Sequence, residues 1–125
     1  MTLTATRPVK RGTKYDSTIR RARAQPPRAP HVYVIVAKGT PLAKIGMSTN
    51  VAARRRQLQT ACPHELQVAL VIPHGGRRLE RLLHSMWLPT RARQNVKTEW
   101  FVLGKGGLDS IIRWCKSEGI TTGYP

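Results

Sequence analysis

One apolar run, His31-Val-Tyr-Val-Ile-Val-Ala37, constrains the fold of this 125-residue chain more than any other segment. Its β-branched and aromatic side chains are apolar on both faces of an extended chain, so it is expected to be a central strand of a sheet. Lys38-Gly-Thr-Pro41 is typical of a turn, and apolar residues resume over Leu42–Gly46. Residues 31–46 are therefore predicted to form a hairpin.

A helix and a third strand are predicted next. Polar residues 48–50 offer N-caps to a helix over Val51–Ala61, which ends before Pro63. Apolar residues recur at every second position of residues 65–73, which predicts a strand. The apolar residues expected together on one face of that strand are Leu66, Val68, Leu70 and Ile72.

A second helix is predicted after the turn at Gly75-Gly76 and is expected to end near Pro89. Its apolar stripe consists of Leu79, Leu82, Leu83 and Met86. A basic connection over residues 91–97 then leads to a short strand over Trp100–Leu103. Gly104–Gly107 is expected to be a flexible turn.

A third helix, from Leu108 onward, completes the pattern. Asp109 is expected in its first turn, where a carboxylate suits the helix dipole, and Gly119 near its end. The order ββαβαβα predicts an α/β (α+β) class, with a small central antiparallel sheet flanked by helices.

The charge of the chain indicates its partner class. Lys and Arg number 22 against 6 Asp and Glu, for a net charge of +16. Such a surface attracts polyanions, because each neutralised phosphate releases condensed counterions. Nucleic acid is therefore the expected partner, although ribosome-associated proteins and cationic membrane binders share this composition.

Residues 1–30 differ from the rest in composition. They carry eight Lys or Arg, one acidic residue and four Pro, with few large apolar side chains. We expect a basic, flexible N-terminal arm that adds phosphate contacts, with at most a short helix through Arg23, and a folded domain over residues 31–125.

The location of the protein is expected to be cytoplasmic. No apolar run approaches the ~20 residues of a membrane-spanning helix, and the first twelve residues lack the apolar stretch of a secretory signal. Cys62 and Cys115 are isolated, which fits a reducing compartment better than a disulfide framework or a structural zinc site.

Few carboxylates are available for chemistry in the folded part. Glu80 lies four residues before His84, which places both side chains on one face of the second helix. This carboxylate can hold a hard divalent cation while neighbouring arginines receive phosphate oxygens. The alternative is a glutamate in local salt bridges on a solvated helix face. The arginines concerned are Arg77, Arg78 and Arg81.

An ordered set of motifs resembles the GIY-YIG nuclease superfamily. The set comprises Val32-Tyr33, Lys44-Ile45-Gly46 within Lys-Ile-Gly-Met-Ser-Thr-Asn, Arg54 with Leu58-Gln59-Thr60, Leu79-Glu80-Arg81-Leu82-Leu83-His84, and Glu99-Trp100-Phe101. It is most similar to the phage and meiotically up-regulated branch, and it covers roughly residues 31–103. The resemblance implies a compact GIY-YIG-like α/β fold with a small antiparallel sheet.

The resemblance also implies a metal-dependent endonuclease acting on nucleic acid, DNA rather than RNA. Tyr33 would be a base or proton relay, Arg54 would steady phosphate charge, and Glu80 would bind a single Mg²⁺ or Mn²⁺ ion. Lys44 stands where the family has a tyrosine, so it can bind phosphate but cannot supply a phenol. His84 is a further candidate catalytic residue. A targeting protein partner is also expected.

Several alternatives remain open at this point. Two departures from the family pattern favour a catalytically degenerate nucleic-acid-binding module of the same fold. Lys44 replaces the tyrosine of the second motif, and His31-Val32-Tyr33 lacks the glycine of the first motif. A metal-free ribonuclease using His84 and Lys44 is a third option. Arg55 and Arg56 are expected on a solvated basic face that binds nucleic acid, and Glu99 is expected to orient His84 or an arginine, or to form a salt bridge at a strand edge. The nuclease interpretation requires Tyr33, Arg54 and Glu80 to converge.

Overall fold

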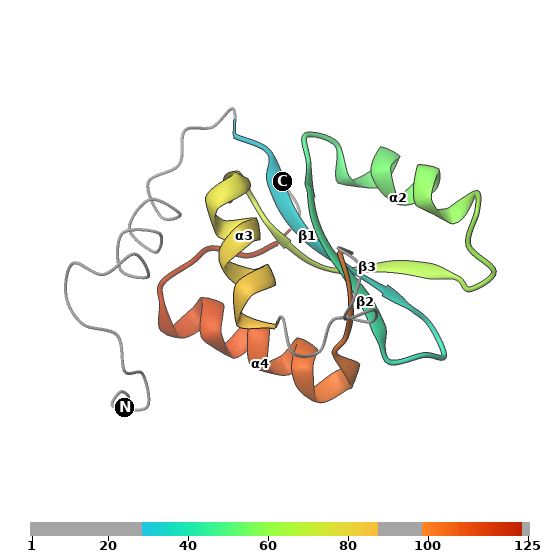
Figure 1. Cartoon of the computed structure of the whole chain (residues 1–125). Helices are drawn as coiled ribbons and strands as arrows, with labels where there is room; N and C mark the ends of the chain where they lie inside the picture. Colours follow the sequence, from blue (N-terminus) through green and yellow to red (C-terminus); the bar gives the residue numbers. More distant parts are fainter. Residues whose placement is uncertain (1–28, 88–98, 124–125) are drawn as a thin grey trace.

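A computed structural model describes residues 29–87 and 99–123. Figure 1 shows one sheet with helices packed against it. The elements are β1 (His31–Ala37), β2 (Leu42–Ser48), α2 (Val51–Gln59), β3 (Leu66–Ile72), α3 (Gly76–Met86), β4 (Trp100–Val102) and α4 (Gly104–Ser117). The four strands are antiparallel in the order β3-β1-β2-β4. The predicted fold class and the predicted order of elements are both confirmed, and the arrangement is compatible with a GIY-YIG-like fold.

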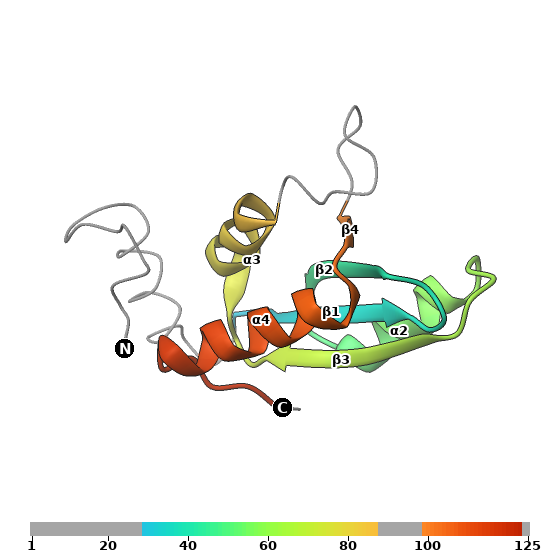
Figure 2. The ribbon, with the colours of Figure 1, turned by 90° about the horizontal axis from the view of Figure 1, so that it is seen from below.

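The central position of β1 follows from its composition. Val32 and Val34 face one hydrophobic core, whereas Tyr33 and Ile35 face a second core. The first core includes side chains of α3 and α4, and the second includes Val51 of α2. The sheet therefore separates two cores, with α3 and α4 on one face and α2 on the other (Figures 1 and 2).

The face predicted for β3 is wrong for half of its length. Val34 pairs with Leu70 and Ile35 with Val68, so the register shifts between neighbouring residues of β1. One extra residue of β3, Ala69, is inserted there and reverses the alternation. Leu70 therefore packs in the α3/α4 core, whereas Val68 packs on the α2 side.

The third helix begins earlier than the glycine-rich sequence predicts. Residues 104–107 form the first turn of α4 instead of a flexible turn, and Gly107 N–H donates to Leu103 O at 3.1 Å. Asp109 consequently lies beyond the first turn, so the predicted dipole interaction is wrong. Gly119, with φ of +70°, follows the helix end as predicted, in a conformation that favours glycine.

Some predictions lie outside the described residues. These are the basic arm and its short helix over residues 1–28, the end of the second helix near Pro89, and the basic connection over residues 91–97. Within the described ranges, no helix has both the length and the apolar character needed to cross a bilayer.

Candidate functional site at the edge of β2

Tyr33 reaches the candidate site by crossing β2 at a glycine. The two residues are partners in the β1–β2 register, and the Tyr33 side chain is 1% exposed. A Cβ atom on Gly46 would lie 2.5 Å from the Tyr33 hydroxyl oxygen and 2.7 Å from its ring carbon. The absence of a side chain at Gly46 therefore makes room for the phenol above β2.

β4 covers only part of the outer edge of β2. Its pairing runs from Leu42 to Lys44, and Ile45 N–H donates to Glu99 O at 3.0 Å. Beyond Ile45, no residue of the described ranges pairs with β2 on this side. The candidate site lies where this pairing ends.

Arg54 comes to the Tyr33 hydroxyl from α2. The Asn50 side chain caps this helix by accepting from Ala53 N–H at 3.0 Å, which positions its first turns. Burial raises the pKa of Tyr33, while the hydrogen bond and charge of Arg54 lower it and the charges of Glu99 and Glu80 raise it further. The pKa stays above its usual value, so at neutral pH Tyr33 is a neutral phenol beside a guanidinium ion.

Lys44 lies on the same face of the sheet as Tyr33, opposite Ile35 in the register. Tyr33 and Lys44 therefore share a face, but they are not directly opposed, because Tyr33 pairs with Gly46. Lys44 is 7% exposed, and its Nζ donates to Glu99 Oε1 at 2.5 Å. The buried ammonium group is therefore paired with a carboxylate at the start of β4.

Glu80 approaches the same edge from α3. It is 8% exposed, and burial raises the pKa of its carboxyl group. The charge of His84 lowers this pKa, that of Glu99 raises it, and those of Arg77 and Lys44 lower it. No hydrogen bond or close ion pair to its carboxylate is found within the described residues.

His84, one turn further along α3, is bound to the backbone of β2. Its Nε2 lies 2.7 Å from Ile45 O. A carbonyl oxygen only accepts, so Nε2 carries the proton in this contact and Nδ1 is the nitrogen that can take up another. The ring also contacts Phe101 of β4, with centroids 5.2 Å apart.

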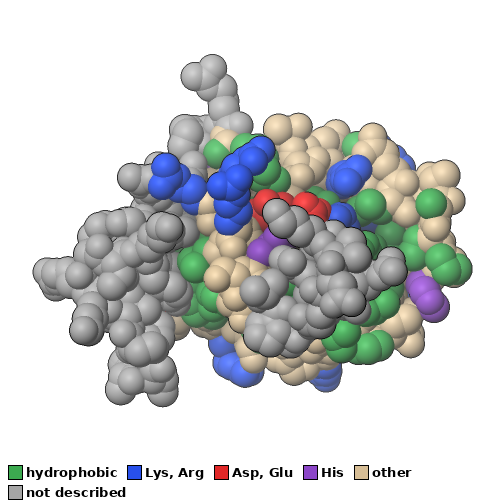
Figure 3. All heavy atoms as spheres, in the orientation of Figure 1, with side chains coloured by type: hydrophobic (Ala, Val, Ile, Leu, Met, Phe, Trp, Pro, Cys, Tyr) green, Lys and Arg blue, Asp and Glu red, His purple; other side chains and the backbone are tan. Residues whose placement is uncertain are grey.

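Electrostatic interactions link Tyr33 to Arg54 and to Glu80, which supports the convergence that the nuclease interpretation requires. Arg54 and Glu80 both act on Tyr33, and Lys44 and His84 both act on Glu80. Figure 3 shows acidic side chains gathered beside a histidine, with Lys or Arg side chains around them. The site draws on both faces of the sheet, because Tyr33 belongs to the α2 side whereas Glu80 is on α3. Their catalytic roles stay predictions.

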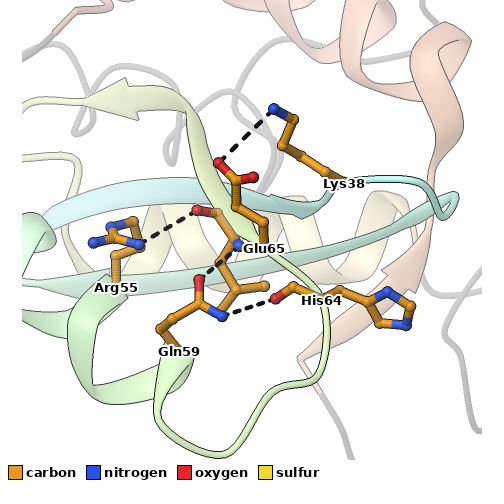
Figure 4. A network of polar contacts seen from close by, with 6 residues as sticks. Lys38, Arg55, Gln59, His64 and Glu65 are labelled. Atoms are coloured by element: carbon orange, nitrogen blue, oxygen red, sulfur yellow. Dashed lines mark hydrogen bonds and ion pairs between the residues drawn. The ribbon is translucent and has the colours of Figure 1, made fainter.

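The arginines predicted to bind nucleic acid divide into two groups. Arg55 is partly buried, and its guanidinium donates to Leu66 O at 3.4 Å, so it ties α2 to the start of β3 (Figure 4). The exposed members are Arg56, Arg77, Arg78 and Arg81. These four side chains are open to a ligand.

Arg55 belongs to a network that holds the connection between α2 and β3. Gln59 accepts from Leu66 N–H at 2.8 Å and donates to His64 O at 2.8 Å. Glu65 beside it lies 3.8 Å from Lys38 of the hairpin turn. Figure 4 shows these side chains around the loop. Since the contacts are to backbone atoms and a surface lysine, the network stabilises the loop away from the candidate site.

The donor groups at the edge of β2 fit a hard divalent ion. Glu80 offers a buried carboxylate without a protein partner in the described ranges, and a cation would offset the cost of burying its charge. Mg²⁺ is commonly held by one or two carboxylates, with water and phosphate oxygens as further ligands. No group of three or more His, Cys, Asp or Glu in the described part could hold a metal, so a closed all-protein site is not formed there.

Two residues of the site were not among the predicted catalytic residues. Glu99 was expected to orient His84 or an arginine or to form an edge salt bridge, and it pairs with Lys44. Gly46 was noted only as part of a motif, yet it makes room for Tyr33. The sequence carried a signal for Glu99, because Trp100 and Phe101 mark a strand directly after it.

The structure is a small α+β domain with a four-stranded antiparallel sheet. The model of one family, the T5orf172 domain, matches residues 30–116, and the chain belongs to this family. Searches of curated proteins and of solved structures found no significant match. The family is nuclease-related, so the chain is a nuclease-like or DNA-binding module at this level of description.

The family match corrects the resemblance drawn from the sequence. Assignment to the GIY-YIG superfamily and its meiotically up-regulated branch is wrong, because the matching family model is that of the phage-associated T5orf172 domain, and no GIY-YIG family model matches. The motifs that carried the resemblance are short and individually unspecific. They therefore indicated the type of domain without identifying its family.

Proposed function

We propose that this protein is a metal-dependent endonuclease that hydrolyses phosphodiester bonds in nucleic acid, with DNA as the expected substrate. The observation that carries the proposal is that the charges of Arg54 and Glu80 both act on Tyr33, while those of Lys44 and His84 act on Glu80. The membership of a nuclease-related family supports it. Hydrolysis needs groups that bind phosphate, move a proton and stabilise developing negative charge, and these side chains offer all three.

Arg54 stabilises the negative charge that grows on the nonbridging phosphate oxygens. Tyr33, with its raised pKa, acts as a neutral hydrogen-bond donor and relay instead of a phenolate base. His84 accepts the proton of the attacking water at Nδ1, since its Nε2 proton is held by Ile45 O.

Glu80 holds a single Mg²⁺ or Mn²⁺ ion in this proposal. A bound divalent ion supplies Lewis-acid stabilisation of the phosphate and leaving oxygens. The exposed arginines of α2 and α3 bind the flanking backbone without reading sequence. The residues concerned are Arg56, Arg77, Arg78 and Arg81, with Arg55 contributing if its contact to Leu66 O is exchanged for a phosphate.

Nicking of supercoiled plasmid tests the proposal. The wild-type protein is expected to nick with Mg²⁺ or Mn²⁺ and to be inactive in EDTA. Glu80→Gln should abolish nicking, and Tyr33→Phe and Arg54→Ala should each lower the rate by about a hundredfold or more. Glu65→Gln, an exposed glutamate bound only to Lys38 among the described residues, is the matched control and should retain the wild-type rate.

The same assay separates the other functions. Tight, salt-sensitive binding with intact plasmid would contradict an enzyme and indicate a binding module. Cleavage of RNA that persists in EDTA would point to a metal-free ribonuclease. Urea unfolding of each variant controls for loss of fold.

A further inference from the structure

The ion pair between Lys44 and Glu99 is unequal in exposure. The Lys44 side chain is 8% exposed and that of Glu99 is 43% exposed. The lysine ammonium binds Glu99 Oε1, so it has little open surface to offer a phosphate. Lys44 is therefore engaged within the protein, whereas Glu99 is open to a ligand and has a second carboxylate oxygen outside this contact.

The backbone holds Glu99 in place as well. Its carbonyl accepts from Ile45 N–H at 3.0 Å, and Ile45 O in turn lies 2.7 Å from His84 Nε2. Glu99 is thus fixed by backbone pairing and by its side-chain contact with Lys44. Glu99 is held by its backbone and by its side chain, so its carboxylate is preorganised to act as a metal ligand.

Glu80 is close enough to Glu99 for the two charges to act on one another, and both act on Tyr33. Two neighbouring carboxylates, one of them largely buried, repel each other, and this repulsion is costly unless a cation lies between them. Lys44 neutralises Glu99, but Glu80 is more than nine-tenths buried and has no close partner among the described residues. The carboxylate of Glu80 therefore lacks a close counter-ion within the described residues, although the charges of Arg77 and Lys44 act on it.

We propose that Glu99 is a second carboxylate ligand of the divalent ion together with Glu80, and that Lys44 is a positioning residue that orients Glu99. This inference rests on the proposed metal-dependent function. It gives Lys44 a different task from phosphate binding. Carboxylates that bind metal are commonly hydrogen-bonded by neighbouring residues, and Mg²⁺ sites with two carboxylates leave room for water and substrate oxygens.

Mn²⁺ titration of the full-length protein, followed by electron paramagnetic resonance without nucleic acid, tests the inference. Glu80→Gln should remove specific binding, and Glu99→Gln should weaken it by about tenfold or more. Glu65→Gln makes the same change at an exposed glutamate paired with Lys38 and should bind as the wild type does.

Lys44→Met discriminates further. Removal of a nearby positive charge by itself strengthens binding of a cation, so a residue that only binds phosphate would give unchanged or tighter Mn²⁺ binding. A positioning residue gives the opposite result, and we expect binding about tenfold weaker. Urea unfolding of both variants should show that the fold is retained.

Wild-type Mn²⁺ affinity in Glu99→Gln would overturn the inference, as would tighter binding in Lys44→Met or no binding by the wild-type protein. Plasmid nicking distinguishes this failure from failure of the proposed function. Metal-dependent nicking together with unaltered Mn²⁺ binding in Glu99→Gln overturns the inference alone. Absence of nicking by a wild-type protein whose Mn²⁺ binding needs both glutamates overturns the nuclease proposal alone.

Discussion

At the scale of single residues, the candidate site depends on a position that carries no side chain. Gly46 does not need glycine for its backbone, since its φ is not positive, but any Cβ there would overlap the Tyr33 hydroxyl group. The phenol can therefore reach the edge of β2 only while this position stays empty. The glycine of the Lys44-Ile45-Gly46 motif is therefore needed to leave space for the Tyr33 side chain.

Gly46→Ala is expected to displace the Tyr33 hydroxyl and lower the nicking rate by about a hundredfold, because a shift of about 1 Å can cost that much in rate. It should also lower the free energy of unfolding by about 1–3 kcal/mol through overpacking. Plasmid nicking and urea unfolding measure the two effects.

Gly106→Ala is the matched control, since a Cβ at Gly106 meets nothing within 4 Å. The double variant Tyr33→Leu, Gly46→Ala should recover part of the lost stability, because the shorter side chain vacates the space, and it should stay inactive. A Gly46→Ala protein with wild-type rate and stability would show that the phenol does not depend on this space.

The residue scale also shows what a sequence can reveal about a site. Tyr33, Glu80 and His84 were predicted from residue type, spacing and resemblance. The pairing of Lys44 with Glu99 could not be predicted, because it depends on the register between β2 and β4, which the sequence of a three-residue strand does not determine.

At the scale of elements, two histidines join the start of β1 to the turn that precedes α3. His74 N–H donates to His31 Nδ1 at 3.0 Å, and the two rings lie 4.5 Å apart. The acceptor must be unprotonated for this contact. Burial, and then the charge of His74, lower the pKa of His31 below its ordinary 6.5.

This contact predicts a loss of stability in acid. Because the folded-state pKa of His31 is lowered, the unfolded chain binds more protons once the pH falls below about 6.5, and the free energy of unfolding then decreases until the folded pKa is passed. Above pH 6.5 the contribution is fully present. Urea unfolding at pH 7.5 and 5.5 measures it.

His31→Asn is the test variant, because an amide oxygen can accept from His74 N–H without titrating. It should lose less stability between the two pH values than the wild-type protein, whereas His64→Gln, at an exposed histidine, should lose as much as the wild type. Equal losses in the wild type and His31→Asn would show that the His31 contact does not sense pH.

The sequence predicted which segments form strands and helices, but it did not predict the irregularity within β3 or the start of α4. Composition, capping residues and periodicity together identified the strands and helices of the described ranges. The bulge at Ala69 and the early start of α4 escaped prediction, since both arise from pairing and packing with segments distant in sequence.

At the scale of the whole molecule, the net charge of +16 dominates encounters with nucleic acid. The logarithm of the binding constant should fall linearly with the logarithm of salt concentration, by about 0.9 for each phosphate neutralised in duplex DNA. The arm supplies a share of these contacts if it binds as its composition predicts.

Replacing Arg20, Arg21 and Arg23 by Gln in the full chain should therefore make this salt dependence shallower. The same charge change on α4, at Lys105, Arg113 and Lys116, is the control and should have a smaller effect, since the predicted binding surface lies on α2 and α3. Fluorescence anisotropy with a labelled duplex over a range of NaCl measures both slopes. Equal slopes for the two variants would mean that the arm attracts DNA only through its charge.

The candidate site draws on both faces of the sheet, and this affects how the protein tolerates substitutions in its cores. The Tyr33 phenol belongs to one hydrophobic core, and Glu80 lies on α3, which packs on the other core. Loosening on either side of the sheet would move one half of the proposed site relative to the other. If the proposed function holds, substitutions in either core are therefore expected to affect the site even when they lie far from it.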